Sequence, residues 1–423
     1  MTSLTRIFRP LENSPDIRFN LETEEFQVAN AVIRRDPAWV SVSDVFTRGA
    51  VTVAMERDLF KRDDAKVILE RLNRLDAIKN YQVPVHVLKD FDYEEVTEIF
   101  VRVNSRGTRL REAELAIARL AFRLPGIVTE EMKSFEEDLD ASGYDIDLRF
   151  LVRCLTGVAT GQSRFGPLGS VSEDEIRASW QKTRSAVEYL LNLLQNNLGI
   201  ETADWLPSRN AIVVPVAYLA QTPHRDVDAV GLLRWFLLAS TWQRYAGSAE
   251  SALDQDLRAL AQADHFKTLS QQILQEVGRD RVLPEDLDDA GSQSPFFLVT
   301  YLACRRNGAV DWWTGVKLNS TNLGTDHALE IHHVFPRALV SERYPRRDVN
   351  EIANMAFLSQ RANREIWATD PSEYLPKIPE ERLRQQFIPL DRDLWRIERF
   401  QDFLAERRRL IAAGINSVFK DLE

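Results

Sequence analysis

The sequence contains few of the residues that would place it in a specialised structural class. Only two of its 423 residues are cysteine, Cys154 and Cys304, and they lie too far apart to suggest a disulfide framework or a thiolate metal site. Glycine and proline number 17 each, which excludes collagen-like and low-complexity architectures. No apolar run approaches the roughly 18 residues of a membrane span, so no membrane partner is expected.

The N-terminus shows no secretory signal, because residues 1–14 include Arg6, Arg9 and Glu12 and have no apolar core. We therefore expect a cytoplasmic protein. The composition is typical of a globular chain, with 44% hydrophobic and 28% charged residues, and the length predicts two or three domains. No internal repeat of about 20 to 50 residues is found.

The charge is distributed unevenly. The formal net charge of −10 argues against a protein that coats nucleic acid without specificity. Residues 305–423 carry 19 Lys and Arg against 18 Asp and Glu, which leaves −11 for residues 1–304, and six arginines oppose three acidic residues within residues 337–364. This basic stretch is either a solvated surface or a surface for phosphates, and the histidines beside it favour the second interpretation.

Hydrophobic periodicity predicts a mainly helical chain. A strand is expected at residues 81–88, and two helices are expected on either side of a glycine-containing turn at 104–107. The second of these helices is too apolar on one face to be a recognition helix, so we favour core packing over DNA reading. Residues 130–310 read as successive amphipathic helices, and a last helix is expected from Asp393 to about residue 413, with Gly414 as its C-cap.

Three of the six histidines, His327, His332 and His333, fall within seven residues. The pair His332-His333 lies in an expected strand that Pro336 ends. A returning strand is expected over residues 352–358, and Ser359 is a plausible N-cap for a helix that carries Asn363. This strand–strand–helix order would bring His332 and Asn363 together.

The residue types suit phosphodiester hydrolysis, which needs a water nucleophile, a base and a cation that neutralises charge. Imidazole titrates near neutral pH and suits the base, while an imidazole and an amide oxygen leave open positions on a divalent ion. Taken singly, each histidine or asparagine is better explained as an ordinary strand, turn or helix-surface residue. Their joint spacing favours a site.

The HH pair, Pro336 and the two later asparagines resemble the ββα-metal, or HNH, nuclease motif. The resemblance implies that His333 is the general base, that His332 and Asn363 bind a divalent metal, Mg²⁺ or Mn²⁺, and that Asn354 belongs to the catalytic site and braces its loop. Asparagine stands at the last position, where this superfamily more often has histidine. The implied partner is DNA, and the basic stretch supplies the candidate contacts: Arg337, Arg346, Arg347, Arg361 and Arg364.

Longer segments resemble the GmrSD-type restriction endonucleases. Residues 331–340 (IHHVFPRALV) and 350–375 look like that family's C-terminal HNH domain, and residues 100–115 and 244–260 look like two signatures of its N-terminal region. The implied fold is mainly α with a small α+β part. It comprises a remnant of a ParB-like domain at residues 1–125, a helical middle domain at 126–304 and an HNH-like nuclease domain at 305–423.

One motif of that family, Asp-Gly-Gln-Gln-Arg, is absent, so no cofactor-binding residue is assigned. The chain is then a shortened copy, a product of a late start, or a protein whose partner supplies the motif. The expected function is a metal-dependent DNA endonuclease of a restriction or phage-defence system, in a family whose members include enzymes that restrict modified DNA. The alternative is a catalytically idle module that binds DNA or a partner. The histidine cluster disfavours a purely structural scaffold.

Overall fold

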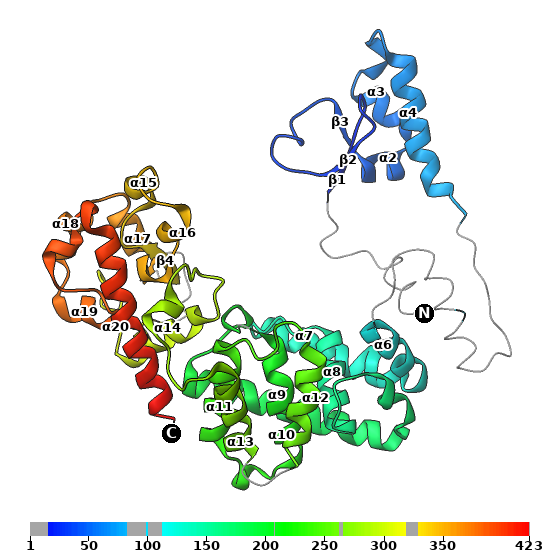
Figure 1. Ribbon diagram of the computed structural model, residues 1–423. Helices are drawn as coiled ribbons and strands as arrows, with labels where there is room; N and C mark the ends of the chain where they lie inside the picture. The colour runs from blue at the N-terminus through cyan, green and yellow to red at the C-terminus, as the bar shows by residue number, and fades with distance from the viewer. Residues whose placement is uncertain are drawn as a thin grey trace. The chain divides into compact units, whose positions relative to one another are not determined.

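A computed structural model describes residues 16–82, 99, 112–206, 208–261, 265–318 and 329–422. The chain divides into two compact units, residues 1–103 and 104–423, and each is described by itself (Figure 1). Both are built mainly from helices with a small amount of sheet. Most of the strand expected at residues 81–88 and the turn expected at 104–107 lie outside the described residues. The expected boundaries after residues 125 and 304 stay predictions.

The first unit contains a three-stranded antiparallel sheet of order β2-β1-β3. The strands are β1 (Ile17–Asn20), β2 (Phe26–Val28) and β3 (Trp39–Ser41). Three helices follow, α2 (Val42–Arg48), α3 (Ala50–Glu56) and α4 (Ala65–Ala77). Helix α4 buries Ile68, Leu72 and Leu75, whose spacing of four and three residues places them on one face toward the core.

The second unit begins with a series of packed helices, as the periodicity predicts. They are α6 (Glu112–Arg123), a π-helical segment (Ile127–Met132), α7 (Lys133–Ala141), α8 (Leu148–Thr160), α9 (Glu173–Leu198), α10 (Val213–Gln221), α11 (Ala229–Thr241), α12 (Ala249–Ala259), α13 (His265–Val277) and α14 (Phe296–Arg306).

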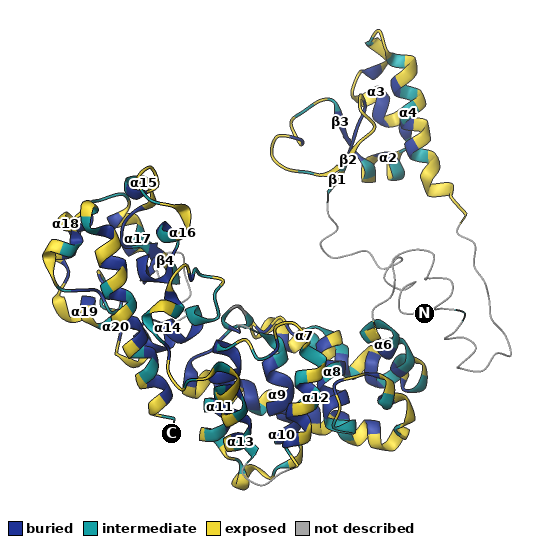
Figure 2. Cartoon of the chain, viewed as in Figure 1, coloured by how far each residue is buried: buried dark blue, intermediate teal, exposed yellow. Residues whose placement is uncertain are grey.

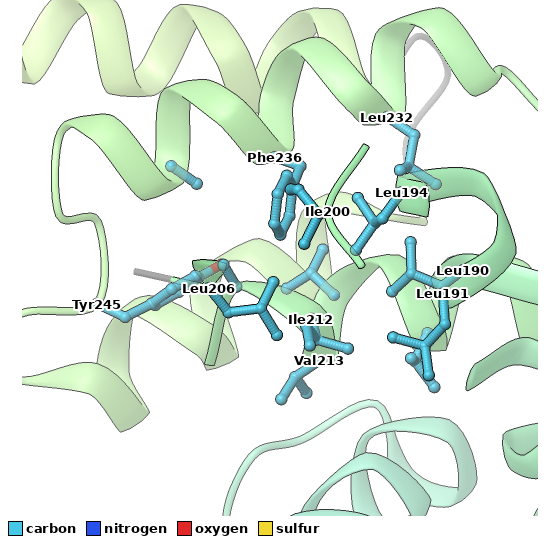
Figure 3. Packing of buried hydrophobic residues seen from close by; sticks show 14 of the residues in the cluster. Leu190, Leu191, Leu194, Ile200, Leu206, Ile212, Val213, Leu232, Phe236 and Tyr245 are labelled. Carbon is cyan, nitrogen blue, oxygen red and sulfur yellow. The ribbon is translucent and has the colours of Figure 1, made fainter. Parts of the chain in front are cut away.

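Helix α9 is the longest element of this helical part. A capping box starts it, because Ser172 Oγ accepts a hydrogen bond from the backbone N–H of Glu175 (3.3 Å) and the Glu175 carboxylate accepts one from the N–H of Ser172 (3.1 Å). Gly199 ends it in the left-handed conformation (φ +64°). Its leucines meet side chains from the 3₁₀ turn Arg209–Ile212, from α10 and from α11 in the core (Figure 3). Burying each leucine contributes about 1.5–3 kcal/mol.

A polar cluster joins the turn after α11 to α12 and α13. The side chain of Arg244 is 5% exposed and donates to both carboxylate oxygens of Asp256, at 3.2 and 2.9 Å. Asp256 also accepts from the hydroxyl of Tyr245 (2.8 Å), and Arg244 reaches the carboxylate of Glu276 (2.6 Å). Because the donors and acceptors match, the charges of Arg244 and Asp256 are buried without losing their hydrogen bonds.

The C-terminal part contains a two-stranded antiparallel sheet formed by β4 (Leu329–His333) and β5 (Met355–Ser359). The connection between them carries α15 (Arg337–Val340), α16 (Arg346–Val349) and a 3₁₀ turn (Ile352–Asn354). Helix α17 (Gln360–Ile366) follows β5 and packs against both strands. The chain then continues through α18 (Pro371–Tyr374), α19 (Glu380–Gln385) and the long α20 (Phe400–Lys420).

Side chains cover the outer edge of β5. The Gln386 amide accepts from the N–H of Phe357 and donates to its C=O, both at 2.8 Å, in the manner of a neighbouring strand. One carboxylate oxygen of Asp311 accepts from the N–H of Ser359 (2.8 Å). These contacts satisfy edge groups that would otherwise be open to pairing. They hold β5 in the register that faces β4.

Helix α20 contacts both cores of the second unit. Phe400, Phe403 and Leu404 belong to the C-terminal core, and Ile411 and Ile415 belong to the helical core. Figure 2 shows buried and exposed residues alternating along this helix. Helical packing therefore continues from the middle of the chain into its C-terminal part.

The predicted end of the last helix is wrong. Residues 393–399 form 3₁₀ turns, and α20 begins at Phe400 and continues through Gly414 to Lys420. A Cβ atom on Gly414 would lie 2.3 Å from the Phe387 ring, so glycine here makes room for a neighbouring aromatic side chain. From the sequence alone, a glycine that allows two segments to approach closely cannot be told from a glycine that ends a helix.

Among the described residues, no helix combines the length and the apolar character that crossing a membrane requires.

Candidate functional site

Strand β4 turns the two adjacent histidines to opposite faces, as the period of two requires. His332 is 2% exposed, whereas His333 is partly exposed at the end of the strand. They pair across the sheet with Ala356 and Met355 of β5. Each histidine therefore has its own set of neighbours, although both lie at the same end of β4.

His332 lies against Asn363 of α17. Its Nδ1 is 2.8 Å from the Asn363 Oδ1, and its Nε2 is 3.4 Å from the hydroxyl oxygen of Tyr374. Glu330, two residues earlier on the same face of β4, accepts a hydrogen bond from Asn363 Nδ2 (2.6 Å). The ring of Trp312 stands edge-on to the imidazole. The contact between His332 and Asn363 joins two residues that lie 31 positions apart in the sequence.

The groups around the His332 ring include more hydrogen-bond acceptors than the ring has N–H groups to donate. Tyr374 donates its single hydroxyl proton to the C=O of Val334 (2.8 Å), so toward His332 it can only accept. Asn363 also presents an acceptor, since its Nδ2 is committed to Glu330. Burial lowers the pKa of His332 to about 4, so the ring is neutral and has one N–H for two acceptors. Whichever tautomer forms, one ring nitrogen faces an acceptor with its lone pair.

A cation beside His332 Nδ1 and Asn363 Oδ1 would remove this conflict. The two atoms are 2.8 Å apart, close to the roughly 3 Å that separates adjacent ligands of an octahedral ion bound at about 2.1 Å. Imidazole nitrogen and amide or carboxylate oxygen are ligands that Mn²⁺ and Mg²⁺ accept. Within the described residues, no group of three or more His, Cys, Asp and Glu side chains is placed to hold a metal. Such a site therefore depends on the amide of Asn363.

His333 is oriented by Asn350. Its Nε2 lies 3.2 Å from Asn350 Oδ1, and Asn350 Nδ2 donates to the C=O of Arg346 (2.9 Å). That second bond fixes the amide, so the oxygen faces the imidazole, Nε2 carries the proton and Nδ1 has the lone pair. Burial lowers the pKa of His333, and Arg337 adds to the effect. The imidazole is therefore neutral near pH 7 and able to accept a proton.

Asn354 holds the chain that follows His333. Its Oδ1 accepts from the N–H of Phe335 (2.8 Å), and its Nδ2 donates to the C=O of Phe335 (3.1 Å) and of Val349 (2.9 Å). The residue is 0% exposed. All these partners are backbone groups, so Asn354 positions the loop.

The five arginines expected to contact DNA come from three short helices around β4 (Figure 1). Arg337 begins α15, Arg346 and Arg347 begin α16, and Arg361 and Arg364 lie on α17. All five are exposed. Arg347 is 3.4 Å from both Asp289 and Asp348, so part of its charge is balanced locally.

Some neighbours of the histidines were not predicted from the sequence. Glu330 has a recognisable signal, because residues two apart in a strand share a face. Tyr374 and Asn350 have none, since each reaches its histidine from a separate segment. His327, the third member of the sequence cluster, lies outside the described residues.

A buried carboxyl group lies next to Asn350. Glu351 is 1% exposed, with Oε1 3.0 Å from Nε of Arg408, but the two atoms are not aligned as a hydrogen bond. Burial raises the pKa of Glu351 to about 7, although Arg408 opposes the shift. A folded-state pKa above the unfolded value means that the folded protein binds more protons. The contribution of Glu351 to the free energy of unfolding is then fully present below about pH 4.3 and is lost as the pH rises through about 7.

We expect Glu351→Gln to remove this pH-dependent loss. Relative to the parent, its free energy of unfolding should rise between pH 5 and pH 8 by on the order of 2 kcal/mol, since the amide does not ionise. Arg408 keeps Asp288 at 3.0 Å as a partner. Denaturant titration at both pH values measures the change, with the exposed Glu342→Gln as control. An equal difference at the two pH values would contradict the prediction.

No family model matches the chain. Among curated proteins, it is 20% identical over 340 residues to the uncharacterized protein MJ0686 of Methanocaldococcus jannaschii. The matched region covers 74% of this chain and 55% of the archaeal protein, so the chain spans about half the length of the relative that it matches.

Proposed function

We propose that the chain is a metal-dependent DNA endonuclease. One observation carries the proposal: His332 Nδ1 and Asn363 Oδ1 lie 2.8 Å apart in a cluster that has one N–H too few for its acceptors, at the end of the strand where a neutral, oriented His333 follows. A divalent ion held by His332 and Asn363, with Glu330 beside them, would supply positive charge for the phosphate and the leaving oxygen.

The residues of the site then have distinct roles in the proposed reaction. His333 takes a proton from a water molecule at Nδ1, because Nε2 is committed to Asn350. Asn350 fixes the ring, and Asn354 fixes the loop that follows it. Glu330 orients the amide of Asn363. The alternation of β4, which turns the two histidines apart, is compatible with one site because the strand ends at His333.

The arginines supply the contacts to DNA. Arg337, Arg346 and Arg361 are exposed on three helices around β4 and match the charge of a phosphate backbone. Each neutralised phosphate contributes a slope of about −0.9 to log K against log salt, so binding by few arginines should be weak and salt-sensitive. Because residues 1–304 carry a net charge of −11 and repel phosphates, we expect DNA to bind only at the surface of these arginines.

The wider role that we propose is in a restriction or phage-defence system, and it rests on the resemblance of residues 331–340 and 350–375 to GmrSD-type enzymes. Modified DNA is then a candidate substrate. A partner that carries the absent Asp-Gly-Gln-Gln-Arg motif would account for its absence and would make cleavage by the isolated chain low. The proposed site needs no such motif.

A second candidate is an idle module that binds DNA or a partner. The burial of His332, at 2% exposure, favours it, because a ligand that no ion can reach has only a structural role. Metal binding separates the two candidates.

The test is cleavage of modified and unmodified plasmids by the full chain with Mg²⁺ or Mn²⁺, and with EDTA instead. We expect cleavage with metal and none with EDTA. His332→Ala should weaken metal affinity, seen by calorimetry with Mn²⁺, and higher Mn²⁺ should restore part of the cleavage. The exposed control His224→Ala should behave as the parent. Cleavage that EDTA does not affect, or an unchanged Mn²⁺ affinity in His332→Ala, would rule out this metal site.

A further inference from the structure

Trp367 is the most exposed of the large hydrophobic residues in the described part of the second unit. Its exposed fraction is 82%, against 39% for Trp313. It stands directly after α17, and its backbone N–H donates to the C=O of Asn363 (3.0 Å). A tryptophan that packs against so little of its own chain leaves most of its apolar surface in water, one helical turn from the proposed site.

The backbone at Trp367 is also strained. Its φ and ψ are 44° and −112°, a combination that favours glycine and that a bulky side chain rarely adopts. Such conformations cost free energy and persist where the surrounding structure imposes them. A helix that ends here would be more stable with glycine. The exposed ring and the strained backbone are therefore two unfavourable features of the same residue.

The surroundings of Trp367 are those of a nucleic-acid contact. Helix α17 carries Arg361 and Arg364, both exposed, and one acidic residue, Glu365. Aromatic rings beside arginines bind nucleotides, because the ring stacks on a base while the cations meet the phosphates. In an intact duplex the bases are stacked on one another, so their faces are closed to a side chain. An exposed ring therefore fits a base that has left the stack.

We propose that Trp367 stacks on an unstacked nucleobase of DNA beside the phosphodiester that the site addresses. The inference builds on the DNA endonuclease function proposed above and adds a substrate preference, for DNA with an unpaired or extruded base next to the cleaved bond. Arg361 and Arg364 hold the adjoining phosphates. Trp367 has no part in the chemical step.

Binding in EDTA tests the proposal without cleavage. The full chain and its Trp367→Ala, Trp367→Leu, Trp367→Phe and Trp367→Gly variants are titrated into a fluorescein-labelled single-stranded 15-mer and into the duplex of the same sequence. Phe122→Ala, which removes another exposed aromatic side chain, is the matched control. The alanine, leucine and glycine variants should bind the single strand about 5- to 150-fold more weakly, while Trp367→Phe keeps most of the affinity. Duplex binding should change little.

The melting temperature separates stacking from a structural role. Trp367→Gly should melt about 2 °C higher than the parent, because glycine relieves the strained backbone. A lower melting temperature would mean that the ring supports the fold, and would overturn the proposal. So would unchanged single-strand affinity in Trp367→Ala, equal losses on both DNA forms, or a parent chain that does not bind the single strand. Failure of metal-dependent cleavage alone would reject the nuclease and leave this result standing.

Discussion

DNA cleavage is expected to fall by about 10²- to 10⁴-fold when His333 is replaced by alanine, since a general base typically contributes that much to the rate. The reason lies in the orientation of the imidazole. Asn350 Oδ1 accepts a hydrogen bond from Nε2–H of His333, which leaves the lone pair on Nδ1 for the proposed proton transfer from water. Folding, Mn²⁺ affinity and DNA binding should remain near those of the parent, because His333 is partly exposed and lies on the opposite face of β4 from His332.

Single-turnover cleavage of a plasmid with Mn²⁺ measures this change. Asn350→Ala serves as the comparison: it keeps the base but frees its ring, so we expect a smaller loss than in His333→Ala. Arg343→Ala should cleave like the parent, because this exposed arginine of the basic stretch lies 3.7 Å from Glu398 and is not among the proposed DNA contacts. Equal cleavage by His333→Ala and the parent would remove His333 from the mechanism and the nuclease proposal with it.

The free energy of unfolding is expected to fall by about 3–5 kcal/mol in Asp256→Ala. Asp256 is 1% exposed and receives hydrogen bonds from Arg244 and Tyr245. Removing the carboxylate leaves the guanidinium of Arg244 buried with Glu276 as its remaining charged partner. It also leaves the hydroxyl of Tyr245 without its acceptor. Breaking a buried pair in this way costs more than the pair contributes, because Arg244 stays buried with one carboxylate partner where it had two.

Urea titration of the full chain measures this loss, provided that the slope of the transition stays constant. Glu188→Ala is the matched control, since it breaks an ion pair with Arg184 in which both side chains are more than 40% exposed. We expect that variant to lose less than 1 kcal/mol, as exposed pairs do. A loss below about 1 kcal/mol in Asp256→Ala would mean that the cluster contributes little to the helical core.

Features whose signals are local could be predicted from the sequence. The order of two strands and a helix around the histidines follows from Pro336 as the end of the first strand, from the short apolar run before Ser359 and from Ser359 as N-cap. In the structure, Ser359 Oγ does accept from the N–H of Ala362 (3.2 Å) at the start of α17. The meeting of His332 and Asn363 was predictable for the same reason, because so short a strand–strand–helix unit allows few arrangements.

The groups that surround these residues come from tertiary contacts that the sequence does not reveal. Tyr374 approaches His332 from α18, Gln386 covers the edge of β5, and Asn350 reaches His333 from the end of α16. Gly414 could be read as a C-cap until the ring of Phe387 was found against it. Such contacts join segments that no short-range rule relates. Side-chain packing and the need to satisfy buried polar groups select them once the elements have come together.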